Sequence, residues 1–342
     1  MKSQLNISFN LVISIIIGIV VFIIVFNLGS SFFSISSEAS SIRVYNHFDL
    51  LVRNLQSEAN YARAVRLSKS YSFQFDGERI LLKGLPQSID ARDSLVVLPK
   101  EFDSERLVFF SRRSSYPLSN TDYTYIVPDN RKFFIFDDQT GQDSEFSSEI
   151  FDFLPRRRVY NPVSGEEELM LDKYLVKMTD INAIITACRT IYPCYIIYVN
   201  KDPHPDLDNL NAKIFQIRGN PESGKAILHS TSEEFYYFSM ESLMAAIVLS
   251  EKELYNAALR KINRTTAFNN LLNNNHFELL KSINPSDCED FLEDAKDLSN
   301  KITQSFSDFY NNPDSSSVSA LKQKQEAYNQ ALLELDKNGC LR

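Results

Sequence analysis

The stretch Gly219 to Lys225 is the part of this chain whose spacing most suggests chemistry, because it has the G-x-x-x-x-G-K pattern of a phosphate-binding loop. In such a loop, backbone N–H groups cradle the phosphates and a following hydroxyl binds Mg²⁺. Here Ala226 occupies the hydroxyl position, and the next residues favour a strand where the loop would need a helix N-terminus. We therefore predict a hairpin turn and no nucleotide site.

Two acidic segments carry the oxygen ligands that Ca²⁺ prefers. They comprise Asp137, Asp138, Asp143 and Glu145 around Gly141 in one segment, and Asp202, Asp206 and Asp208 in the other. Neither segment has the spacing of an EF-hand loop, so we expect surface turns. The histidines stand far apart in the sequence, and no G-x-S-x-G elbow occurs. The sequence thus predicts no catalytic residue, no cofactor and no metal site, and we expect no enzymatic activity.

The four cysteines bear on stability. Cys288 opens one C-terminal helical segment and Cys340 closes the next, with a turn at 311–314 between them. In an antiparallel helical hairpin those two ends lie side by side, within reach of the ~3.8 Å Cβ separation that a disulfide requires. We predict a Cys288–Cys340 bridge and hence a body outside the cytoplasm, where disulfides persist. The sequence leaves open whether Cys188 and Cys194 also pair.

The N-terminal sequence predicts where in the cell the protein lies. No charge lies between Lys2 and Glu38, and the residues from Leu11 to Phe26 are apolar except for Ser14 and Gly18. With its flanks this run reaches the ~20 residues that span hydrocarbon as a helix. We predict a short cytoplasmic head at 1–4 and a transmembrane helix at 5–34. Because Lys2 precedes the span, the positive-inside rule favours a cytoplasmic N-terminus and an exported body.

Three forms of this segment remain open: a signal peptide cleaved near Ala39, an uncleaved anchor, and a leader cleaved between Ser3 and Gln4. The order of Lys2, Ser3 and Gln4 ahead of the apolar run resembles the class III signal of archaeal type IV pilin-like proteins. The resemblance covers about the first 30 residues. It implies a membrane peptidase that cuts before Gln4 and an apolar helix that serves as an assembly element.

A helical stalk is expected at 35–70. This stretch lacks Pro and Gly from Ser37 to Ser70, and its apolar residues recur at steps of three and four. A continuous helix from Leu5 to Leu67 would be about 95 Å long. Pilin-like proteins have such a helix, and a juxtamembrane coiled coil would show the same pattern.

The fold class that we predict for the remainder is α+β. Alternating residues around Asp76 and Gly77 predict a hairpin within a small antiparallel β unit at 71–130. At 131–240, strand, helix and strand follow one another, which favours a parallel Rossmann-like sheet, and short turns between the later strands add an antiparallel extension. At 241–342 the sequence is helical and ends in an αα-hairpin.

The formal net charge of −8 argues against a nucleic-acid-binding protein, which needs a clustered basic face. Asn263 opens a glycosylation sequon that matters only if the body is exported. We expect a single-pass, surface-exposed structural or interaction protein at the cell membrane, with a pilin-like subunit as one form of it. Its partners would be the lipid bilayer and, through the N-terminal helix, further copies or other surface proteins. The alternative is a membrane-anchored sensor with a ligand cleft in the α/β unit.

Overall fold

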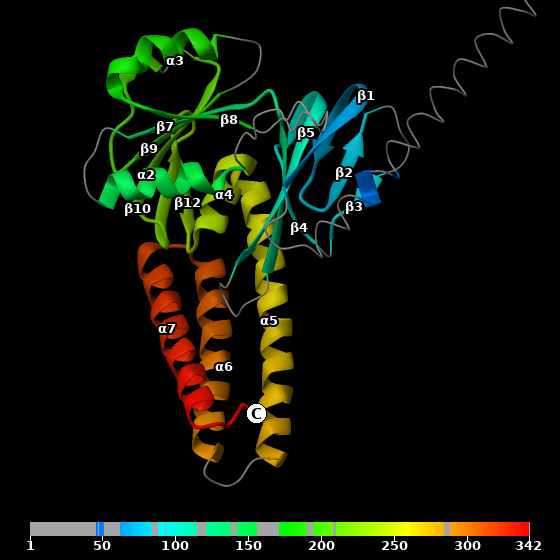
Figure 1. Ribbon diagram of the computed structural model, residues 1–342, viewed down its shortest axis with the longest axis vertical. Helices are drawn as coiled ribbons and strands as arrows, with labels where there is room; N and C mark the ends of the chain where they lie inside the picture. The colour runs from blue at the N-terminus through cyan, green and yellow to red at the C-terminus, as the bar shows by residue number, and fades with distance from the viewer. Residues whose placement is uncertain are drawn as a thin grey trace, which may run out of the picture. The chain divides into compact units, whose positions relative to one another are not determined.

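The structure is a computed structural model (Figure 1), and it describes residues 46, 48–50, 62–83, 88–92, 94–114, 121–137, 142–155, 171–189, 194–207, 210–283 and 288–341. Two compact units divide the chain: Met1–Leu51 with Gly84–Pro86, and Val52–Lys83 with Gln87–Arg342. Of the first unit, the described part is a few helical residues between 46 and 50. The predicted span at 5–34 and the cleavage bond between Ser3 and Gln4 lie outside the described residues. Within the described ranges, no helix combines the length and apolar character that crossing a membrane requires.

One six-stranded sheet of the second unit occupies the region that we expected to be β-rich. Its strand order is β3-β2-β1-β5-β6-β4. The bounds are β1 Ala62–Phe75, β2 Arg79–Leu82, β3 Ser88–Asp90, β4 Leu95–Val97, β5 Glu101–Ser114 and β6 Thr121–Pro128. The expectation of a purely antiparallel unit is wrong, because β4 pairs with β6 in parallel. That pairing follows from position: β4 lies beyond β6, and both run antiparallel to β5, which the chain enters directly after β4.

Strand β1 corrects the predicted helical stalk. The chain is already extended at Ala62, so a helix that continues to Leu67 or a stalk that reaches residue 70 is wrong. Residues of β1 pair with β5 from Ala62 opposite Phe110 to Gln74 opposite Glu101, with a register shift between Arg66 and Tyr71. This ladder of long-range hydrogen bonds outweighs a local apolar period of three and four, which is only a weak preference.

The second sheet has the order β12-β11-β10-β9-β7-β8. Its bounds are β7 Lys132–Phe136, β8 Asp172–Val176, β9 Cys194–Val199, β10 Ala212–Asn220, β11 Ser223–Leu228 and β12 Glu233–Tyr237. Four neighbouring strands, β8, β7, β9 and β10, are parallel to one another. Strands β11 and β12 continue the sheet with antiparallel pairing. The predicted parallel core with an antiparallel extension is therefore present. Helices α2 (Gln142–Phe153) and α3 (Ile181–Cys188) cover opposite faces (Figure 1).

Helix α4 (Met240–Leu249) joins the two sheets. Every residue from Ser242 to Leu249 is buried, and the helix contacts β4, β5 and β6 of the first sheet as well as β11 and β12 of the second. Its N-terminus is capped by Ser239 and Ser242, each of which accepts a hydrogen bond from the other's backbone N–H. Tyr125 adds a tie between layers, because its hydroxyl donates to the carbonyl of Glu241 at 2.7 Å. The core is thus shared by both sheets.

The C-terminal region contains three long helices: α5 (Lys252–Ile283), α6 (Glu289–Asn311) and α7 (Ser315–Lys337). Helices α6 and α7 form the predicted hairpin. Helix α5 also packs along α6, so the region is a three-helix bundle and not a hairpin alone (Figure 1). The reason is its length: 32 residues carry α5 far past the sheets, alongside the two following helices.

Candidate functional site

The parallel sheet has a topological switch point between β7 and β9. From β7 the chain passes through α2 to β8 on one side, whereas from β9 it passes to β10 on the other. In open α/β sheets, ligands bind outside the carboxyl ends of the strands at such a point. A binding site is therefore expected at the end of β9 and the start of α2.

A cleft of about 590 Å³ lies there. It is lined by residues of α2, the end of β9 and the β10–β11 turn: Gln142, Asp143, Glu145, Phe146, Glu149, Asn200, Gly219, Asn220, Pro221 and Glu222. Four of these side chains are carboxylates. We call this cavity the acidic cleft.

Asn200 holds the walls of the acidic cleft together. It follows β9 directly and adopts a left-handed backbone with φ of 50°, which asparagine tolerates better than most residues. Its Nδ2 donates to Asp143 Oδ1 at 2.6 Å and to the carbonyl of Gly219 at 3.0 Å, while its Oδ1 accepts from the Gly219 N–H at 3.0 Å. One side chain thereby joins β9, β10 and α2.

The charges of the acidic cleft are unbalanced. Partial burial, with Glu145 and Glu222 nearby, raises the pKa of the Glu149 carboxyl above its usual value. Lys322 of α7 forms an ion pair with Glu222 at the rim. Because a single lysine faces four carboxylates among the described residues here, the cleft favours a cationic group.

The G-x-x-x-x-G-K stretch forms the hairpin turn that the sequence predicts. Gly219 and Gly224 face each other across β10 and β11, and a Cβ on Gly219 would lie 2.7 Å from the Gly224 Cα. The glycines are required by this close approach and not by a phosphate. Lys225 forms an ion pair with Glu234 of β12 at 2.6 Å, so its amine is directed to the neighbouring strand.

The acidic segments do not converge on a metal. Asp143 and Glu145 lie in the first turn of α2, and Asp202 accepts hydrogen bonds from Gln216 and Arg218. Asp138, Gly141 and Asp208 lie outside the described residues. Within the residues that are described, no three His, Cys, Asp or Glu side chains are grouped so that they could share an ion.

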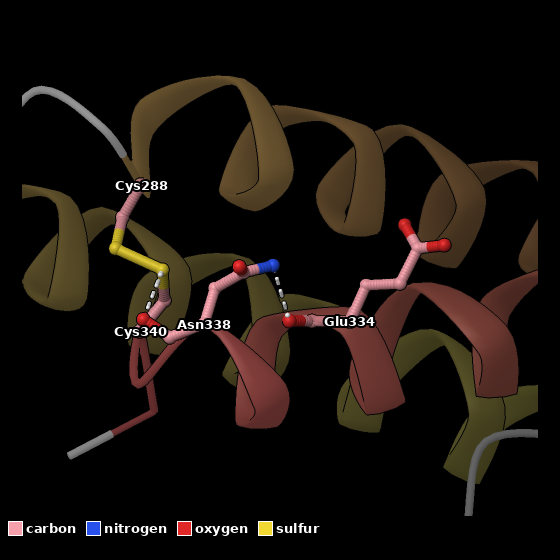
Figure 2. Close-up of a disulfide and its surroundings, with 4 residues drawn as sticks. All are labelled: Cys288, Glu334, Asn338 and Cys340. Atoms are coloured by element: carbon pink, nitrogen blue, oxygen red, sulfur yellow. Dashed lines mark hydrogen bonds between the residues drawn. A yellow bond between two sulfur atoms is a disulfide. The ribbon is translucent and has the colours of Figure 1, made fainter.

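Cys288 and Cys340 are joined in the structure, as Figure 2 shows. Their Cα atoms are 5.7 Å apart. Helix α7 ends in a Schellman motif: the N–H of Gly339 donates to the Asp336 carbonyl, and that of Cys340 donates to the Leu335 carbonyl. Gly339 takes the left-handed conformation at φ of 73°, which turns the chain back and brings Cys340 to the start of α6. Cys188 and Cys194 form a second bridge, between α3 and β9.

Asn263 lies in the middle of α5 and is partly buried, in a less open position than its sequon suggested. The sequence did not point to Asn200, Glu149 or Glu222. The one signal for Asn200 was its place directly after a wholly buried strand, since polar residues at strand ends often line α/β sites.

Comparison of the chain with protein-family models, with curated proteins and with solved structures finds no match.

Proposed function

We propose that this chain is a single-pass, membrane-anchored protein whose folded body lies outside the cytoplasm, and that it acts by binding. The pairing of all four cysteines carries this proposal. Disulfides persist in oxidising compartments and are rare in the cytosol, so two bridges in one chain support an exported body. The apolar run between Lys2 and Glu38 supplies the anchor and the orientation.

The acidic cleft is the binding site in this proposal. It supports the sensor or ligand-binding form of the protein over a purely structural one, because a purely structural subunit would not need a hollow at the switch point of its sheet. Its carboxylates favour a ligand with an amine, a guanidinium group or a divalent cation. The lipid bilayer and other surface proteins remain the partners of the N-terminal segment.

Compartment and ligand are tested separately. Non-reducing peptide mapping of protein from its native membrane should recover the Cys288–Cys340 and Cys188–Cys194 peptides as linked pairs. Free thiols at all four positions would contradict the exported body. Protease added to intact cells gives an independent result, since an exported body is cleaved and a cytoplasmic one is protected.

For the ligand, the melting temperature of the full chain in detergent would be measured with Ca²⁺, spermidine and arginine, and with neutral sugars as controls. The double variant Glu145→Gln with Glu149→Gln should lose the shift that a cation produces. Glu326→Gln, on the exposed face of α7, is the matched control and should keep it. A cation shift of equal size in both variants would place binding elsewhere.

The pilin-like form of the proposal depends on the leader alone. Its test is N-terminal mass spectrometry of the native protein, in which a mature chain that begins at Gln4 supports a leader peptidase and self-assembly through the apolar helix. An intact Met1 would leave the anchor and remove the pilin-like assembly.

A further inference from the structure

Arg131 is a buried cation with no ion-pair partner among the described residues. It lies in the turn between β6 and β7 and is only 7% exposed. Its Nε and Nη1 atoms are sealed from solvent and form no hydrogen bond. Among the described residues, no carboxylate lies within ion-pair distance of its guanidinium. A buried charge in this state is strongly unfavourable, so a structure retains one where a counter-ion can reach it.

A cavity of about 350 Å³ reaches this side chain. It is lined by Pro99, Lys100, Glu101, Arg131, Lys213 and Glu251. Arg131 precedes β7, and Lys213 is near the start of β10, so the cavity lies at the amino ends of the parallel strands. The acidic cleft lies at their carboxyl ends, and the two sites share no residue.

Two of the three cations that line this cavity, Arg131 and Lys213, form no ion pair among the described residues, and the lining has one more cation than carboxylates. Lys100 forms an ion pair with Glu251 at 2.9 Å, which accounts for one cation and one carboxylate. Lys213 donates from Nζ to the Ser250 hydroxyl and has no carboxylate partner among the described residues. Burial lowers the pKa of Lys213, and the nearby Arg131 lowers it further, as expected for two cations held together. Glu101 is the remaining acid of the lining.

We propose that this cavity binds a compact oxyanion, a phosphate or carboxylate group, between the Arg131 guanidinium and the Lys213 amine. Arg131 lines the cavity, and its Nη2 atom, unlike Nε and Nη1, is not among the buried atoms that lack a hydrogen-bond partner, so we assign the contact with the anion to Nη2. A guanidinium and an amine together offer several donors to the oxygens of one anion, and such charge-assisted hydrogen bonds are stronger than neutral ones. Glu101 and Glu251 beside the cavity disfavour long polyanions. The ligand class is therefore a small molecule or a chain end with one anionic group.

The full chain in detergent is titrated with inorganic phosphate, sulfate, acetate and succinate, each against chloride at equal ionic strength. Calorimetry reports affinity, and the melting temperature reports stabilisation. We expect phosphate or a carboxylate to bind and to raise the melting temperature where chloride does not. The anion that binds most tightly identifies whether the site prefers a phosphate or a carboxylate group. If none of the four anions binds, the proposal is overturned.

Arg131→Met keeps most of the side-chain volume and removes the charge. It should weaken anion binding by about tenfold or more, because a charge-assisted hydrogen bond is lost. Without anion it should melt at or above the wild-type temperature, because an unpaired buried charge has been removed; a structural role for the guanidinium would give a clear fall. Lys213→Met is the second variant and should also weaken binding. Arg79→Met, on an exposed position of β2, is the control. Equal binding by Arg131→Met and Arg79→Met would overturn the proposal.

Discussion

Cys288 and Cys340 are separated by 52 positions in sequence and by 5.7 Å between their Cα atoms. The two helices between them are equally long, at 23 residues each, so the free ends of the hairpin are level. The Schellman turn at the end of α7 then directs Cys340 toward α6 (Figure 2). The bridge closes the end of the hairpin opposite its turn.

Removal of this bridge should cost more stability than removal of the other. On the chain-entropy model, Cys340→Ser releases a long loop and should lower the free energy of unfolding by about 4 kcal/mol. Cys194→Ser releases a short loop, since Cys188 is 6 positions away, and should cost about 2 kcal/mol. Urea unfolding without reductant measures both. Equal losses would show that loop length does not set the contribution.

Gly339 should be replaceable by asparagine but not by alanine. No atom lies within 4 Å of a Cβ built there, so the constraint is the left-handed backbone at φ of 73°. Gly339→Ala should lower the free energy of unfolding by about 1 kcal/mol, because an L-residue is strained in that region. Gly339→Asn should cost less, since asparagine visits this conformation and occurs at helix ends. Thermal melts of the two variants test this. Similar losses of stability would show that the left-handed backbone at position 339 does not set the cost of the substitution.

The sequence predicted the features that depend on local pattern. Two helices of matched length around a turn implied the Cys288–Cys340 pairing, and a strand, helix and strand order implied the parallel sheet. The prediction of a helix was wrong at Ala62, where apolar residues spaced three and four apart continue into β1. That error is physical: pairing with β5 is a long-range interaction that leaves no mark on the local periodicity.

The two cavities could not be predicted from local sequence patterns, for a related reason. Arg131 stands between Asn130 and Lys132 in what reads as a solvated turn, and it is buried only because distant segments around Lys100 and Lys213 enclose it. The acidic cleft likewise combines Asp143 with Glu222 from another part of the chain. Only the topology of the sheet brings those residues together.

Asp314 should make stability depend on pH at the acidic end. It caps α7, and the Ser317 backbone N–H, with the Ser316 and Ser317 hydroxyls, holds the pKa of its carboxyl below the ordinary value of 3.8. A carboxyl whose pKa is lowered by folding stabilises the protein above its unfolded pKa, and that contribution is lost as the pH falls through the folded pKa. The loss should therefore begin near pH 4 and grow below it.

Two variants separate the cap from the charge. Asp314→Asn keeps an acceptor for the Ser317 N–H and should retain most of the stability at pH 7, with a flatter acid profile. Asp314→Ala removes the acceptor and should be less stable than Asp314→Asn at pH 7. Melting temperatures between pH 3 and 7 provide the comparison. If the acid limb of Asp314→Asn is as steep as that of the wild type, other carboxyls control the transition.

Asn200 should be the residue of the acidic cleft that stability depends on most. Asn200→Gly keeps the left-handed backbone but loses the hydrogen bonds to Asp143 and Gly219, at a cost of roughly 1–2 kcal/mol. Asn200→Ala loses the same bonds and is also strained, so it should cost about 1 kcal/mol more. Asn200→Asp retains an acceptor for the Gly219 N–H but sets a second carboxylate against Asp143, so its stability should improve as the pH is lowered toward 4, unlike that of the other two. Urea unfolding at pH 7 and near pH 4 tests all three, and equal losses for glycine and alanine would show that the backbone conformation at this position carries no strain.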